Sequence, residues 1–232
     1  MKLGIPVYQG VNLLDVAGPL EIFYWTGASK EDFGQAQDLQ TVLISADGNP
    51  VTSINGVTFK VGGSFENTPT LDVLWVPGGK PAALAGLMGK PDSSYIKYLR
   101  QVAKGAMWVC SVCEGALLLA RAGLLDGHKV TTHWAFLNCL KDRQKFPGIK
   151  PEDVDTAYRR FVVSRIPPKN PTENRLTGGG ISSGLDEALQ LIVLLFGEKI
   201  AKNVQRTTQY FPQPPVMGEL PWDPGGCPVT WD

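Results

Sequence analysis

One cysteine with small neighbours is the residue best placed to do chemistry. Cys113 lies in Ser111-Val112-Cys113-Glu114-Gly115, between a run that predicts a buried strand over 107–112 and one that predicts a helix over 114–122. A nucleophile elbow holds its reactive residue on a strained strand-to-helix turn, so the positions two before and two after it must be small. Ser111 and Gly115 meet this requirement. The segment therefore predicts a nucleophilic thiol at Cys113.

The same turn predicts the charge state of that thiol. Open α/β sheets bind ligands at the carboxyl ends of their strands, and the free N–H groups at a helix start favour an anion. Because the thiolate is the nucleophilic form of cysteine, we expect Cys113 to be partly ionised at neutral pH. The alternative is a buried, unreactive cysteine, which the position on the turn disfavours.

Cys110 and Cys113 also match the C-x-x-C pattern of thiol–disulfide exchange. In that chemistry the first cysteine begins the helix, whereas Cys110 lies inside the predicted strand, where side-chain alternation would bury it in the sheet. A structural zinc site is disfavoured because no second cysteine–histidine pair stands at ligand spacing. We therefore expect a nucleophile and no metal.

Backbone and carboxyl groups near other predicted strand ends are candidates to assist the thiol. Asp15 follows the first predicted strand, and is interpreted either as a proton-transferring carboxylate or as a helix cap. Gly78 and Gly79 follow another strand and can expose backbone N–H groups. Together with the Glu114 amide, these groups could form an oxyanion-type hole.

The two histidines give weaker signals. His133 follows a short predicted strand, so it could border the site or could bond neighbouring backbone in a structural role. His128 lies in a predicted surface turn, where we expect it to be solvated.

Short β-rich runs alternate with helical runs, a pattern typical of a parallel sheet flanked by helices. The expected strands are 3–8, 41–46, 71–76, 107–112, 130–132, 158–165 and 175–177, with a hairpin at Asn55-Gly56 that joins 51–53 to 57–61. The expected helices are one that starts over 15–21 with Pro19 in its first turn, and those over 94–104, 114–122, 134–140 and 185–196. We expect one domain over residues 1–205 and a proline-rich tail over 206–232 that extends over the surface.

Composition narrows the class of partner. The 232 residues hold 22 basic and 22 acidic side chains, so no overall field would attract nucleic acid or an anionic membrane. The apolar run at the start is too short for a signal peptide, and no stretch reaches the ~18 apolar residues of a membrane helix. Four cysteines at irregular spacing do not suggest a disulfide scaffold, so we expect reduced thiols and a cytoplasmic location.

Six motifs in order carry a resemblance to a known family. They are Leu14-Asp15-Val16-Ala17-Gly18-Pro19, Val76-Pro77-Gly78-Gly79, Ser111-Val112-Cys113-Glu114-Gly115, Ala122-Gly123-Leu124-Leu125-Asp126-Gly127, Thr131-Thr132-His133-Trp134-Ala135 and Thr177-Gly178-Gly179-Gly180-Ile181-Ser182-Ser183-Gly184. Over about residues 1–205 the chain resembles the ThiJ/PfpI superfamily. Within it, the chain is similar to the isonitrile hydratases and to the amidotransferase-like domain of AraC-type regulators.

The resemblance implies a flavodoxin-like, mostly parallel sheet sandwiched by helices, usually as a homodimer. It implies that Cys113 is the nucleophile, that Asp15 faces it and that the Gly79 and Glu114 amides are the oxyanion donors. The turn at Gly180-Ile181-Ser182 would cap a substrate pocket that Gly78 and His133 also border.

Departures from the patterns of individual family members narrow the range of activities that we expect. PfpI-type proteases place a histidine directly after the nucleophile, where Glu114 stands here, and glutamine amidotransferases need a later His-x-Glu pair that this chain lacks. AraC-type regulators carry a further helix-turn-helix DNA-binding domain, whereas this chain continues into a proline-rich tail, so a role as a regulator is disfavoured. Isonitrile hydratases usually carry threonine after the cysteine, so Glu114 is a second acid that either raises the pKa of the thiol or points away from it.

The resemblance thus favours a cofactor-free, cysteine-dependent hydro-lyase. It would add water to an organic isonitrile and give an N-substituted formamide through a thioimidate on Cys113. Two alternatives stay open: a glyoxalase- or deglycase-like stress protein acting on small reactive carbonyls, and a non-catalytic cysteine redox sensor. The expected partners are a small-molecule substrate and a second copy of the chain, with no nucleic acid and no membrane.

Overall fold

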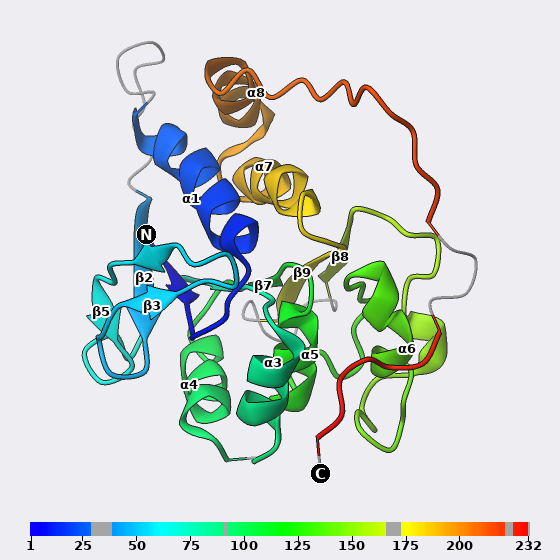
Figure 1. The fold of residues 1–232 in the computed structure, drawn as a ribbon. Helices are drawn as coiled ribbons and strands as arrows, with labels where there is room; N and C mark the ends of the chain where they lie inside the picture. Colours follow the sequence, from blue (N-terminus) through cyan, green and yellow to red (C-terminus); the bar gives the residue numbers. More distant parts are fainter. Residues whose placement is uncertain (29–38, 91, 166–172, 221–224, 232) are drawn as a thin grey trace.

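The computed structural model describes residues 1–28, 39–90, 92–165, 173–220 and 225–231. Its centre is a seven-stranded sheet in the order β5-β2-β1-β6-β7-β9-β8 (Figure 1). These strands are β1 (Lys2–Pro6), β2 (Gln40–Ser45), β5 (Gly63–Ser64), β6 (Val73–Val76), β7 (Trp108–Ser111), β8 (Phe161–Arg165) and β9 (Asn174–Gly178). Neighbours pair in parallel except β8 and β9, which are antiparallel. The mostly parallel sheet that the sequence predicts is confirmed.

Helices cover both faces of this sheet (Figure 1). They are α1 (Leu13–Ala28), α3 (Pro81–Met88), α4 (Ser94–Ala103), α5 (Gly115–Arg121), α6 (Leu137–Leu140), α7 (Ser183–Phe196) and α8 (Glu198–Thr207). α1, α7 and α8 contact one another on one face, and α3, α4 and α5 do so on the other. Within the described ranges, no helix has both the length and the apolar character that crossing a membrane requires.

The predicted elements differ from the structure in a few places. The expected strand over 130–132 is wrong, because Val130 forms only an isolated bridge with Val154. The expected helix over 134–140 is divided into a 3-10 turn (Trp134–Phe136) and the short α6. The sequence patterns predict no helix at α3 or α8, and the structure contains both. The division at residue 205 stays a prediction; α8 ends at Thr207.

The predicted hairpin is confirmed. β3 (Val51–Thr52) and β4 (Thr58–Phe59) form a separate antiparallel pair. Gly56 in its turn has a φ of 83°, a left-handed conformation that glycine adopts without a steric penalty.

Pro19 lies inside α1 and not in its first turn, which corrects the expected start of that helix. Proline has no backbone N–H, so the carbonyl of Asp15 four residues earlier loses its usual helical donor. The indole Nε1 of Trp75 on β6 donates to that carbonyl oxygen at 3.2 Å. The replacement bond ties the first turns of α1 to the central sheet.

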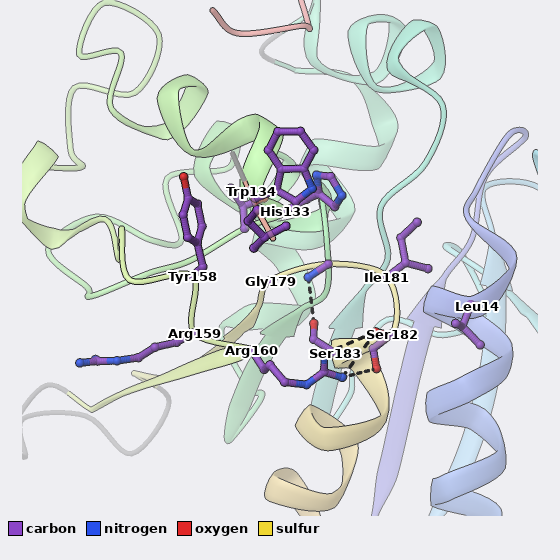
Figure 2. A pocket seen from close by; sticks show the side chains of 13 residues that line it. Leu14, His133, Trp134, Tyr158, Arg159, Arg160, Gly179, Ile181, Ser182 and Ser183 are labelled. Atoms are coloured by element: carbon purple, nitrogen blue, oxygen red, sulfur yellow. Dashed lines mark hydrogen bonds between the residues drawn. The ribbon is translucent and has the colours of Figure 1, made fainter. Parts of the chain in front are cut away.

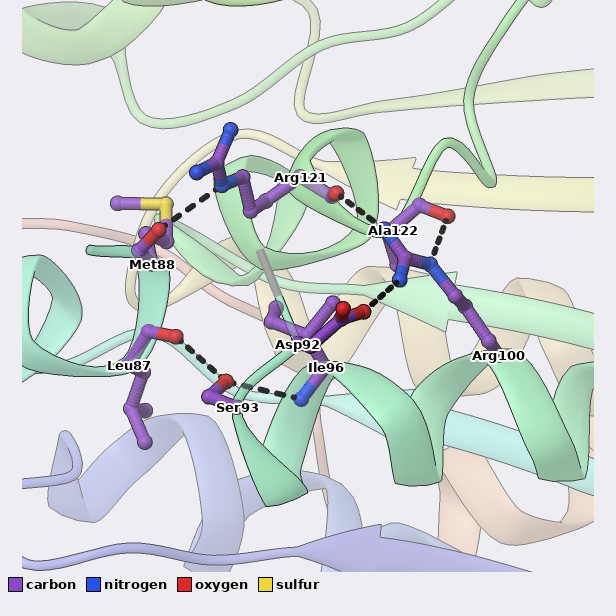
Figure 3. Close-up of polar contacts among 8 residues, drawn as sticks. All are labelled: Leu87, Met88, Asp92, Ser93, Ile96, Arg100, Arg121 and Ala122. Carbon is purple, nitrogen blue, oxygen red and sulfur yellow. Dashed lines mark hydrogen bonds and ion pairs between the residues drawn. The ribbon is translucent and has the colours of Figure 1, made fainter. Parts of the chain in front are cut away.

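Side-chain bonds to backbone hold α3, α4 and α5 together (Figure 3). Ser93 caps α4, since its Oγ accepts from Ile96 N at 3.3 Å and donates to the Leu87 carbonyl at 2.7 Å. Arg121 at the end of α5 donates from Nε to the Met88 carbonyl at 2.8 Å. These contacts fix α5, which follows the turn that carries Cys113.

The described parts of the C-terminal tail, residues 211–220 and 225–231, form no helix or strand. The tail leaves α8 and passes to α6, as the orange-to-red trace in Figure 1 shows. There Cys227 forms a disulfide with Cys139, 88 positions earlier, whereas Cys110 and Cys113 are free. The expectation of four reduced cysteines is therefore wrong for one pair, because irregular spacing does not reveal where an extended tail docks.

The turn between β7 and α5 depends on a close backbone approach. Val112 N donates to the Val76 carbonyl at 3.1 Å, and a side chain added at Gly115 would overlap the same carbonyl. Backbone cannot yield as a flexible side chain can, so only glycine fits at this position.

We predict that Gly115→Ala lowers the free energy of unfolding by about 1–3 kcal/mol, because the added methyl group overpacks the turn. Gly86→Ala is the matched control, since Gly86 lies in α3 and a side chain there meets nothing within 4 Å. That control should gain about 0.5–1 kcal/mol from the better helix former. Denaturant unfolding measures both values, and equal effects of the two substitutions would contradict this account.

Candidate active site

The candidate site lies at the carboxyl ends of β1, β6 and β7. The chain leaves β1 for α1 on one face of the sheet and leaves β6 for α3 on the other, which is the arrangement that opens a crevice in α/β sheets. Asp15, in the first turn of α1, and Gly78, just after β6, meet there. Gly78 N donates to Asp15 Oδ2 at 2.8 Å, so the carboxyl is held by the sheet and does not cap its own helix.

Cys113 lies on the strained turn that the sequence predicts. Its φ of 57° is left-handed, a conformation that a non-glycine residue adopts at a cost of order 1–3 kcal/mol. The hydroxyl of Thr132 donates to the Cys113 carbonyl at 2.7 Å and helps to hold the turn. The cysteine is fully buried, with a relative exposure of 0%.

Two carboxyl groups surround the buried sulfur. One ligand atom from each of Asp15, Cys113 and Glu114 lies within 4.8 Å of the others. The interaction of Glu114 with the Cys113 thiol raises the pKa of the thiol. Asn12 Nδ2 lies 3.2 Å from Glu114 Oε2 and 3.8 Å from Cys113 Sγ. The Glu114 side chain therefore points toward the thiol, which answers the question that the sequence left open.

The backbone donors at the site face the same groups. The Gly79 N–H favours the ionised form of the Glu114 carboxyl and the Glu114 N–H favours the ionised form of the Cys113 thiol, so each lowers the pKa of the group it faces. A side chain at Gly78 would overlap the Glu114 carboxylate, so the turn after β6 needs glycine there. The role of Gly79 and Glu114 as oxyanion donors stays a prediction.

Burial and the neighbouring acids decide the protonation of the site. Burial raises the pKa of the Cys113 thiol well above its ordinary value, and the charges of Asp15 and Glu114 raise it further. The expectation of a partly ionised thiol is therefore wrong, because desolvation outweighs the amides at the helix start. Burial, followed by the charge of Glu114, raises the pKa of Asp15 to about 8. Burial also raises the pKa of Glu114.

The same three side chains form a potential metal-ligand set. Among the residues that the structure describes, this is the one group of histidine, cysteine and acidic side chains whose ligand atoms lie close enough together to hold an ion. A thiolate with two carboxylates is a donor set that zinc accepts. The geometry equally fits a proton shared among acids.

A cavity of about 430 Å³ opens beside this cluster (Figure 2). Its lining comes from α1, the 132–134 and 158–160 segments, the turn before α7, and the tail: Leu14, Thr132, His133, Trp134, Tyr158, Arg159, Arg160, Gly179, Gly180, Ile181, Ser182, Ser183 and Leu220. Of the four predicted pocket residues, it contains His133, Ile181 and Ser182 but not Gly78. Cys113, Asp15 and Glu114 are not among the lining residues, and the cavity adjoins the Cys113 turn through Thr132, whose hydroxyl donates to the Cys113 carbonyl.

The histidines differ from one another in their surroundings. Besides lining the cavity, His133 accepts at Nδ1 from Ala135 N at 3.3 Å, and burial lowers its pKa. The expectation of a solvated His128 is wrong, because its ring is buried and its Nδ1 lies 3.3 Å from Ser164 Oγ. Burial and the charge of Arg175 lower the pKa of His128 to about 4.

Asn12 at the site and Leu220 in the cavity lining are not indicated by any sequence motif. The available signal for Asn12 was its position three residues before Asp15, in the loop that enters α1. Leu220 lies in the proline-rich tail and carries no motif, so only the folded chain shows where it packs.

The fold and the site together define an α/β protein with a cysteine on a nucleophile elbow, flanked by two carboxyl groups. The chain belongs to the DJ-1/PfpI family, whose model matches residues 1–156. It is 34% identical to the isonitrile hydratase of Pseudomonas putida over 95% of this chain and 83% of that protein.

Solved structures agree with this assignment. A ThiJ/PfpI family protein from Pseudomonas syringae superposes with a TM-score of 0.74 at 27% identity, covering 93% of this chain and 77% of that one. The oxidized DJ-1 of Toxoplasma gondii gives a TM-score of 0.68 at 21% identity, covering 90% of this chain and 98% of that one. The second likeness shows the fold alone.

We predict that Glu114→Gln lowers the pKa of the Cys113 thiol, because it removes a negative charge and a proton acceptor from the sulfur. Ultraviolet thiolate absorbance followed against pH measures the shift, with the signal of the Cys113→Ser protein subtracted. Glu152→Gln, a substitution at an exposed position, should titrate like the wild type. An unchanged or higher thiol pKa in Glu114→Gln would contradict the described effect of Glu114 on the thiol.

Proposed function

We propose that the protein adds water to an organic isonitrile and forms an N-substituted formamide through a covalent intermediate on Cys113. The observation that carries the proposal is the pair of acids beside the sulfur: ligand atoms of Asp15, Glu114 and Cys113 lie within 4.8 Å of one another, and burial raises the pKa of Asp15 to about 8. The identity of 34% to an isonitrile hydratase over most of the chain supports the same reaction.

The first step needs a nucleophile and a proton at one carbon atom. The terminal carbon of an isonitrile is electrophilic and has no leaving group. Glu114 takes the proton from Cys113, and the sulfur attacks the carbon. Asp15, which is protonated at neutral pH, gives its proton to that carbon. The product is a thioimidate on Cys113, with Asp15 now ionised and Glu114 protonated.

In the second step the two acids exchange roles: Asp15 accepts a proton and Glu114 donates one. The Asp15 carboxylate takes a proton from water, the hydroxide adds to the thioimidate carbon, and Glu114 protonates the nitrogen. When the C–S bond breaks, the hydroxyl proton passes through the Glu114 carboxylate to the sulfur. The formamide leaves, and all three side chains return to their starting states. No step of this scheme uses a metal or an organic cofactor.

Asn12 and the cavity have supporting roles in this scheme. Asn12 donates toward both the Glu114 carboxylate and the sulfur, so it keeps the base against the thiol. The substituent of the isonitrile would occupy the cavity of about 430 Å³. Thr132 lines that cavity and bonds the Cys113 carbonyl, so the cavity adjoins the nucleophile turn.

We predict that Cys113→Ser and Asp15→Asn each abolish formamide formation, because the first removes the nucleophile and the second removes the acid that protonates the reacting carbon. The assay incubates the protein with cyclohexyl isocyanide and with methylglyoxal and follows formamide and lactate separately. Asp92→Asn, at an exposed carboxylate, is the control and should retain activity. Full turnover by Cys113→Ser would end the proposal, and lactate without formamide would favour carbonyl chemistry.

We also predict that the rate of hydration falls as the pH rises through about 8, since Asp15 loses the proton that it must donate. Below that pH the acid is present, so its contribution to the rate is at its maximum. A pH profile of kcat/KM with cyclohexyl isocyanide measures this descending limb, because kcat/KM reports the pKa values of the free protein. A rate that keeps rising above pH 8 would show that Asp15 does not act as the acid.

A further inference from the structure

Three partly exposed apolar side chains from distant parts of the chain meet in the cavity. Leu14, Ile181 and Leu220 are 39%, 41% and 48% exposed, and all three line it (Figure 2 labels Leu14 and Ile181). Large apolar groups left open to water inside a concave site favour an apolar ligand, which would cover them.

The cationic side chains of the cavity do not alter this preference. Arg160 forms an ion pair with Asp186 and donates to the Ser182 carbonyl at 3.0 Å, so its charge is already compensated. Arg159 points away from the other lining residues in Figure 2 and forms an ion pair with Asp155 at 3.7 Å. The cavity therefore suits an uncharged group.

Leu220 belongs to the C-terminal tail, which is attached to the rest of the protein on both sides of it. On the near side, Tyr210 donates from its hydroxyl to Asp186 Oδ1 at 2.9 Å, and Gln205 Nε2 donates to the Tyr210 carbonyl at 3.2 Å. On the far side stands the Cys139–Cys227 disulfide. The tail thus reaches the cavity between two attachments.

The far attachment is more than a single covalent bond. Asn138 Nδ2 donates to the Gly225 carbonyl at 2.7 Å, and Val229 is buried with 1% exposure. Lys145 Nζ donates to the Val229 carbonyl at 3.3 Å and lies 4.6 Å from the centre of the Trp231 ring. Leu220 lies seven residues before Cys227, so the disulfide confines it to within ~25 Å of the α6 attachment.

We propose that Leu220 is a specificity-determining residue of the cavity and that the Cys139–Cys227 disulfide holds it there. The cavity takes the apolar substituent of the ligand. Leu220, from the tail, completes a wall whose other residues lie between positions 14 and 183. In a reducing compartment the disulfide opens, the tail loses its covalent attachment, and the preference for apolar substituents weakens. This inference deepens the proposed function and rests on it for the identity of the substrate.

Equilibrium binding of a product analogue tests the inference without any turnover. Isothermal titration measures the Kd of N-cyclohexylformamide for the oxidised full-length protein. Leu220→Ala should weaken binding about fivefold, the loss expected from removing ~40 Å² of apolar contact. Cys227→Ser should weaken it to a similar extent, and the double variant should show no further loss, because both changes remove one wall.

Two controls separate this effect from damage to the fold. Met217→Ala alters the same tail at a side chain that is 89% exposed and outside the cavity lining, so binding should match the wild type. Reducing the wild-type protein with dithiothreitol should reproduce Cys227→Ser without any substitution. Thiol titration of the untreated, denatured protein should find two free thiols, Cys110 and Cys113.

The possible outcomes separate clearly. Wild-type affinity in Leu220→Ala, or no binding by the wild type, would overturn the specificity role. Four free thiols before reduction, or full affinity after it, would overturn the role of the disulfide. Binding that follows the expected pattern in a protein that forms no formamide would uphold the inference and reject the proposed function.

Discussion

The site depends on how closely the start of α5 approaches the end of β6. Gly115 lies against the Val76 carbonyl, where no side chain fits, and this contact leaves Cys113 in a left-handed conformation at the turn. The same packing buries the sulfur between α1 and the loop after β6. Asp15 and Glu114 are buried there as well, and their carboxyl groups lie close to the thiol. Geometry at one glycine thus determines which groups share the site.

Burial of three acids in one place determines their chemistry. Charged forms are costly in a desolvated site, and like charges a few ångströms apart cannot all be ionised. The pKa of each of Cys113, Asp15 and Glu114 is raised, so protons stay within the cluster at neutral pH. Such a cluster suits a reaction that moves protons onto and off one substrate, and suits less well a nucleophile that must be permanently ionised. In the proposed mechanism the thiol stays protonated until substrate binds, and Glu114 then takes its proton.

Sequence patterns predicted the sheet and the elbow because both depend on local signals. Buried strand runs and the small residues around Cys113 determine β6, β7 and the turn between β7 and α5. Properties that depend on contacts between distant residues could not be predicted in this way. The Trp75 indole bonds the carbonyl that Pro19 leaves without a donor in α1, and Ser164 contacts the buried His128 ring. The tail brings Cys227 to Cys139. The charge state of Cys113 was also missed, since the amides at a helix start are visible in a sequence and desolvation is not.

The most direct test of this account is to trap the intermediate. The protein is mixed with cyclohexyl isocyanide, quenched in acid within the first turnover, digested and analysed by mass spectrometry. The account predicts that the peptide containing Cys113 gains the mass of one isonitrile molecule, and that this adduct decays as the formamide appears. Formamide produced with the Cys113 peptide unmodified at every time point, or an adduct on another residue, would contradict nucleophilic catalysis by this thiol.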